Sequence, residues 1–137
     1  MTVNTVQAGD IEVSDPPLRF DLLCHRVMDD REMALELLGA AVGRLDQDLA
    51  AIRNAVDRRE TKAAKDLAHR LKGTAGNLSA EPLRRACGQL EITAAAEQIE
   101  SLGHCFGQVD LAAECFRAAA KTLLKASYPP AASARHS

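Results

Sequence analysis

Hydrophobic residues recur along most of this chain at alternating steps of three and four, which is the spacing of one face of an α-helix. The longest such series runs through Leu35, Leu38, Val42, Leu45, Leu49, Ile52 and Val56. Three later series, within residues 64–78, 83–94 and 109–123, keep the same period. The pattern therefore predicts four long helices. Short connections between them favour an all-α fold, an antiparallel up-and-down four-helix bundle.

Capping residues and helix breakers predict where these helices begin and end. Asp29, with Glu32 three residues later, resembles a capping box at the start of the first long helix. Ser79 is the expected cap of the third helix, and Pro82 suits the first turn of that helix. Gly103, in the segment SLGH, is expected to end the same helix.

The polar and unpatterned ends of the chain set the expected domain boundaries. Residues 1–15 predict a flexible N-terminal arm, and residues 127–137 predict a disordered C-terminal tail. Residues 16–126 then form one domain, in which LRFDLLCHRV adds a short helix before the bundle. A length of 137 residues, 47% of them hydrophobic, suits a single domain with its own core.

Charge and hydropathy narrow the classes of partner. A net charge of −2 does not indicate a broad nucleic-acid-binding face. No apolar run has the length of a membrane span, and the first residues lack the pattern of a secretory signal. We therefore expect a cytoplasmic protein with reduced cysteines and no membrane partner. Because we expect all the apolar faces to be buried inside one bundle, we also expect a monomer.

Two histidines adjoin cysteines and leave a metal site open as one alternative. His25 follows Cys24, and His104 precedes Cys105, so a metal-binding helical bundle that joins both ends of the chain is one hypothesis. The chain has no C-x-x-C motif, and the spacing of these pairs fits no familiar zinc finger. We therefore assign no metal ligands.

The segment AHRLKGTAGNLS, residues 68–79, carries two glycines inside a predicted helix. Each glycine there costs roughly 0.5–1 kcal/mol relative to alanine. On a helical wheel, His69, Lys72, Gly73 and Gly76 share the side that faces away from the core. The glycines remove side chains that would flank the imidazole, so that another macromolecule can approach the ring.

The residue types on this face suit the acceptance of a phosphoryl group. A solvent-exposed imidazole is largely neutral near pH 7 and is nucleophilic. The ammonium of Lys72 adds a positive charge beside it, which favours a phosphoryl dianion. Lys65 and Lys62, one and two turns before His69, extend a basic strip that would complement an acidic partner.

The stretch AHRLKGTAGNLSAEPLRRACGQLE resembles the histidine-containing phosphotransfer (HPt) domain of phosphorelays. The matched motif is His-x-x-Lys-Gly-x-x-x-Asn-Leu, from His69 to Leu78, and the likeness extends over roughly residues 22–124. Later positions in register with the family are Leu83, Cys87, Leu90 and Glu91. Many family members have glycine where this chain has Ser79, which puts the turn after that helix in question.

The resemblance implies a four-helix bundle that acts as a phosphoryl carrier. By that likeness, Nε2 of His69 takes a phosphoryl group from a receiver-domain aspartate and passes it to another. Lys72 would stabilise the phosphoryl charge, and Gly73 and Gly76 would leave room for the receiver.

The expected partners are response-regulator receiver domains and a hybrid sensor histidine kinase. The chain has no P-loop or other nucleotide motif, so we expect no ATP site and no cofactor of its own, with Mg²⁺ supplied by the receiver. Whether such a carrier counts as an enzyme is left open. A bundle that only docks receivers without accepting phosphate is the alternative function.

Overall fold

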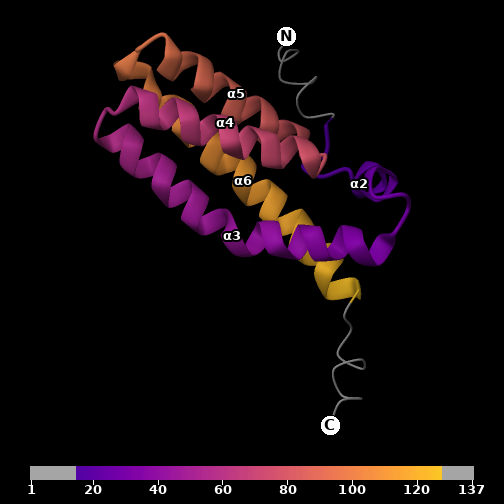
Figure 1. Ribbon diagram of the computed structural model, residues 1–137. Coiled ribbons are helices and arrows are strands. Elements are labelled where there is room, and N and C mark those ends of the chain that lie inside the picture. The colour runs from indigo at the N-terminus through magenta and orange to yellow at the C-terminus, as the bar shows by residue number, and fades with distance from the viewer. Residues whose placement is uncertain (1–14, 128–137) are drawn as a thin grey trace, which may run out of the picture.

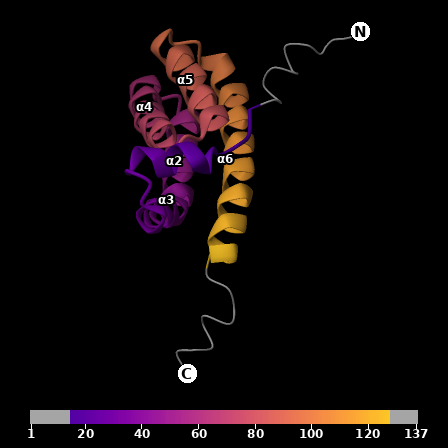
Figure 2. The same ribbon diagram turned by 90° about the vertical axis from the view of Figure 1, so that its right-hand side faces the viewer.

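The computed structural model describes residues 15–127, and five helices account for most of this range. They are α2 (Phe20–Arg26), α3 (Arg31–Asp57), α4 (Thr61–Asn77), α5 (Glu81–Ala95) and α6 (Ile99–Ser127). The last four run antiparallel in a closed bundle, in which α4 and α6 each pack against both α3 and α5 (Figure 1). The short helix α2 lies at one end of the bundle and contacts α3 (Figure 2). The predicted bundle with an extra N-terminal helix is confirmed.

Some predictions about the chain ends cannot be followed in the structure. The arm expected at residues 1–15 and the tail expected at residues 127–137 lie outside the described residues, apart from one residue of each. Among the described helices, none is both long and apolar enough to cross a membrane.

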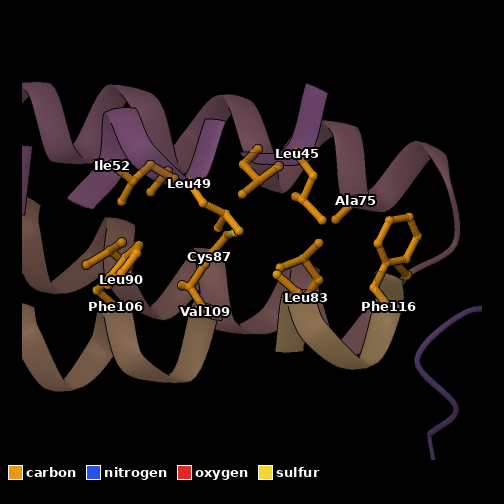
Figure 3. Packing of buried hydrophobic residues seen from close by; sticks show 14 of the residues in the cluster. Leu45, Leu49, Ile52, Ala75, Leu83, Cys87, Leu90, Phe106, Val109 and Phe116 are labelled. Atoms are coloured by element: carbon orange, nitrogen blue, oxygen red, sulfur yellow. The ribbon is translucent and has the colours of Figure 1, made fainter. Parts of the chain in front are cut away.

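The predicted apolar series meet along the axis of the bundle. Leu38, Ile52, Leu90 and Val109 come from three different helices, and each is at most 1% exposed. Figure 3 shows Ile52, Leu90 and Val109 among the interior side chains that point toward one another, with Cys87 between the two sides of the core. Burial of each large aliphatic side chain contributes on the order of 1.5–3 kcal/mol, so the periodic series decide the fold.

One turn geometry closes all three connections within the bundle. Each connection has three residues, and its middle residue has a positive φ: 60° at Arg59, 60° at Ser79 and 55° at Glu97. The N–H of the next residue donates to the carbonyl five residues earlier, at 2.9–3.1 Å. This arrangement satisfies carbonyls at the end of the preceding helix and reverses the chain at once. The antiparallel order follows from these short turns.

The start of α3 differs from its prediction by one residue. Asp30, and not Asp29, is the N-cap, and its carboxylate accepts a hydrogen bond from the Met33 N–H at 3.0 Å. Asp29 has a φ of 62°, in the left-handed region, so it belongs to the preceding turn.

Two further predicted helix ends are wrong. Ala80 occupies the N-cap of α5 without a side-chain hydrogen bond, while Ser79 closes the turn after α4; Pro82 does lie in the first turn of α5. Gly103 lies inside α6, because α5 already ends at Ala95. A single glycine costs a helix only about 1 kcal/mol, which the burial of Leu102 beside it outweighs.

Candidate functional site

The imidazole of His69 stands on the solvent side of α4, as the helical wheel predicts. Its side chain is 65% exposed, whereas Ala68 and Leu71 on the same helix are at most 4% exposed. Those two buried neighbours fix the rotation of α4 about its axis, and that rotation turns the ring outward.

A carboxylate from the neighbouring helix holds both His69 and Lys72. Glu91 of α5 places Oε2 2.9 Å from Nδ1 of His69 and Oε1 2.7 Å from Nζ of Lys72. Its side chain is 23% exposed, so solvent screens these contacts only in part. The hydrogen bond from Lys72, and secondly that from His69, lower the pKa of the Glu91 carboxyl below its usual value. The sequence motif placed Glu91 in register but gave it no role.

The side chain of Lys72 reaches Glu91 by lying across α5. A Cβ added at Gly88 would lie 3.5 Å from the Lys72 Cδ, an ordinary van der Waals contact, so the lysine side chain lies over this position of α5. The Lys72 side chain is 31% exposed. Its ammonium is therefore held by Glu91 and is not a free charge beside the ring.

The contact with Glu91 determines which nitrogen of the ring is available. A carboxylate only accepts hydrogen bonds, so Nδ1 of His69 carries a proton and its N–H donates a hydrogen bond to Glu91. In the neutral ring the other nitrogen, Nε2, then has no proton and offers its lone pair. The arrangement is thus that of a nucleophilic nitrogen on an exposed ring, oriented by a carboxylate through the opposite nitrogen.

The two glycines of the motif differ in their surroundings. A Cβ at Gly73 would meet no atom within 4 Å, so this position leaves open space beside His69, as predicted. A Cβ at Gly76 would lie 3.3 Å from Cδ of Arg84, whose side chain lies against the helix there. Bare surface is therefore found at Gly73, whereas Gly76 makes room for an arginine of α5.

The predicted basic strip is less positive than its sequence indicates. Lys62 pairs with Asp66 on its own helix at 3.3 Å, and Lys72 pairs with Glu91. Lys65, between them on α4, is partly buried. Two of the three positive charges are therefore offset by neighbouring carboxylates.

Hollows border α4 on both sides of its exposed face. One, of about 540 Å³, lies between α2, α4 and α5, and Lys72 and Gly73 contribute to its lining. The other, of about 450 Å³, lies between α3 and α4, with Leu71 and Phe116 in its floor and Arg70 at its edge. The surface near His69 thus has shape and apolar area that a protein partner could fill.

The cysteine and histidine pairs do not form a metal centre in the part of the chain that the structure describes. No group of three or more His, Cys, Asp or Glu side chains within residues 15–127 is arranged to hold a metal ion. Cys105 is buried instead and shares a hydrogen bond with Thr93 at 3.3 Å. His25 and His104 are both exposed.

Comparisons with known proteins agree with this geometry. The family model described as the Hpt domain matches residues 36–126. A solved structure, the HPT domain from an Hpt sensor hybrid histidine kinase from Shewanella, aligns with a TM-score of 0.70 and 19% sequence identity. The alignment covers 79% of this chain and 93% of that domain, and it supports the same fold. No curated protein sequence matches the chain significantly. Because the family model spans most of the bundle, the chain belongs to the Hpt domain family, the histidine phosphotransfer domains of phosphorelays.

Proposed function

We propose that this chain carries phosphoryl groups between receiver-domain aspartates on Nε2 of His69. The observation that supports this assignment is the exposed ring whose Nδ1 is bound to Glu91, which leaves Nε2 as the free nucleophile. His69 also stands next to the open position at Gly73, where a partner can come close to the ring.

The transfer step needs no group other than those of the chain and its partner. The phosphorus–oxygen bond of the receiver's aspartyl phosphate breaks, and the aspartate keeps the electron pair. The lone pair on Nε2 of His69 forms the new nitrogen–phosphorus bond, in line with the departing oxygen. The receiver supplies Mg²⁺ and its acidic pocket, and this chain supplies the nucleophile without a cofactor of its own.

The partners follow from the surface around His69. Receiver domains would dock over Gly73 and the adjoining hollows beside α4. Lys65 and Lys62 lie on the same helix and would contact the acidic rim of the receiver, although the pairing of Lys62 with Asp66 weakens its contribution.

A hybrid sensor histidine kinase is the proposed source of phosphoryl groups. We further propose that the chain acts in the cytoplasm as a monomer, without nucleic-acid or membrane partners.

Incubation with a phosphorylated receiver tests the proposal. The chain should gain a label that acid removes and base does not, which is the behaviour of phosphohistidine. His69→Gln should abolish the label while the helical content is unchanged. A label that survives this substitution contradicts the assignment. An unlabelled wild-type chain that binds receivers, and whose His69→Ala variant binds them equally well, would support the docking-only alternative.

A further inference from the structure

The hollow between α3 and α4 combines an aliphatic floor with positive charge at its rim. We propose that it binds a small amphiphilic anion, a medium-chain alkyl carboxylate, whose tail lies over the floor and whose carboxylate lies at the rim. This inference concerns the chain alone and goes beyond its proposed function in phosphoryl transfer.

The hollow exists because α3 and α4 diverge. The two helices are joined at the turn around Arg59 and move apart toward the opposite end of the bundle (Figure 1). Along its length, α4 packs more extensively against α5 than against α3. Away from the turn, the short side chains of Ala40, Ala41 and Ala75 line the hollow and leave space between the helices. The volume of about 450 Å³ lies within the range of about 300–1,000 Å³ typical of small-molecule pockets.

The floor of the hollow suits an alkyl tail. Leu45, Leu71 and Phe116 contribute to its lining, and each is at most 4% exposed. Leu37 borders the hollow and is 45% exposed, and Leu67 is half-buried. A tail that covers these two leucines removes apolar surface of both the protein and the ligand from water, which is the main driving force for binding an aliphatic group.

The charges at the rim favour a ligand with one negative charge. Arg44 of α3 and Arg70 of α4 line the hollow from its two sides, and both are exposed. Neither guanidinium forms an ion pair with any carboxylate of residues 15–127. Asp48 is the other charged residue of the lining, so two guanidiniums and one carboxylate leave the rim with a single net positive charge. Arginine binds a carboxylate through two parallel hydrogen bonds, whereas Asp48 would repel the second charge of a phosphate monoester.

Titration of the full chain with decanoate tests the site directly. The ligand is kept below its micelle-forming concentration, and NMR follows the leucine methyl groups. The methyl signals of Leu37 and Leu67 should shift and reach saturation. Those of Leu111, which is 62% exposed on α6 and lines neither hollow, should stay unchanged. Equal shifts at Leu111 would show adsorption to any exposed apolar side chain and would overturn the proposal, as would the absence of a saturable shift at Leu37.

The length of the tail tests the aliphatic floor. From hexanoate to octanoate to decanoate, affinity should rise by up to about fourfold for each added methylene group, the effect of burying that group. Leu37→Ala should weaken decanoate binding by about twofold or more, whereas the matched variant Leu111→Ala should bind like the wild type. Affinity that does not depend on tail length, or equal losses in the two leucine variants, would overturn the placement of the tail.

The rim is tested by removing charge from the protein and from the ligand. Arg44→Gln and Arg70→Gln should each weaken octanoate binding by about two- to fivefold, the range for an exposed ion pair. Arg58→Gln, which changes an exposed arginine at the end of α3 outside the hollow, should leave affinity unchanged. Octanol has the same tail without the charge, so it should bind the wild type more weakly than octanoate and should bind all three arginine variants like the wild type. Octanol that binds as tightly as octanoate would overturn the inference that the ligand is an anion.

Failure of this inference can be told apart from failure of the proposed function. The hollow adjoins the surface over which we propose that receivers dock, but these titrations use the chain without a receiver. A chain that is labelled on His69 and shows no saturable binding of decanoate overturns only the ligand site. A chain that binds decanoate and gains no label on His69 contradicts only the proposed function.

Discussion

Substitution of Gly73 separates the requirements of the fold from those of the partner. Gly73 lies in the interior of α4, and a Cβ at this position would meet no atom within 4 Å. Alanine is favoured over glycine in a helix interior by roughly 0.5–1 kcal/mol, so Gly73→Ala should raise the free energy of unfolding by about that amount. Urea denaturation followed by helical circular dichroism measures this gain.

A larger side chain at the same position should obstruct the partner without harming the fold. Leucine is a good helix former, so Gly73→Leu should fold normally. Its side chain would lie one turn from His69, on the face where we propose that the receiver docks. We expect transfer from a phosphorylated receiver to slow by about tenfold or more, the effect of about 1.4 kcal/mol or more of lost contact.

Gly107 of α6 provides a matched control for both effects. A Cβ there also meets nothing within 4 Å, and Gly107 lines neither of the hollows beside α4. Gly107→Ala and Gly107→Leu should therefore stabilise the helix and leave the transfer rate unchanged. Equal transfer by Gly73→Leu and Gly107→Leu would refute the claim that open space at Gly73 serves the partner. A loss of stability in Gly73→Ala would refute the placement of this residue on an open face.

Three further predictions concern single residues. Ser79→Gly should stabilise the fold by about 1 kcal/mol in urea denaturation, because Ser79 has a φ of 60° that glycine adopts without strain; a destabilised variant would contradict this reading of the turn. Asp30→Ala should cost about 1 kcal/mol by the same measurement, since it removes the N-cap hydrogen bond of α3, and an unchanged stability would show that this cap is unimportant. Because the pKa of Glu91 is lowered in the folded chain, its ionised carboxylate contributes stability at pH values above 4.5, the usual pKa of a glutamate. That stability is lost as the pH falls through the lowered pKa. Glu91→Gln should therefore lose less stability than the wild type when urea denaturation is repeated from pH 5 to about pH 3, and equal losses would contradict the direction of the pKa shift.

The helices could be predicted from the sequence because burial determines them. Leu38 and Leu90 belong to separate periodic series, and both are fully buried. Period and burial are linked by the geometry of the helix itself, so the series identify the elements and their inward faces. The same reasoning placed His69 on the outward face of α4.

The helix ends were predicted less well because they depend on backbone conformations that composition does not determine. Glu97 adopts a φ of 55° and closes the turn before α6, although neither glycine nor proline occurs in that turn. Gly103, which is a helix breaker by composition, remains helical because Leu102 and Cys105 beside it are buried. At the start of α3, the choice between Asp29 and Asp30 depends on which of them adopts the left-handed conformation.

Helical periodicity predicted only the part of the candidate site that lies on α4. His69 and Lys72 share a face of α4, and the helical wheel is enough to bring them together. Glu91 lies 22 residues after His69 and reaches it only through the packing of α4 against α5. The position of Glu91 and its ion pair with Lys72 depend on how α4 and α5 are rotated relative to each other. No pattern within either helix carries that information.

The central claim is that Nε2 of His69 carries the phosphoryl group. The most direct measurement is NMR of the ¹⁵N-histidine-labelled chain after phosphorylation by a receiver, in which coupling between nitrogen and phosphorus identifies the bonded atom. We predict coupling to Nε2 of His69 and a proton still bound to Nδ1. Phosphorus bonded to Nδ1, or to another residue, would contradict the account.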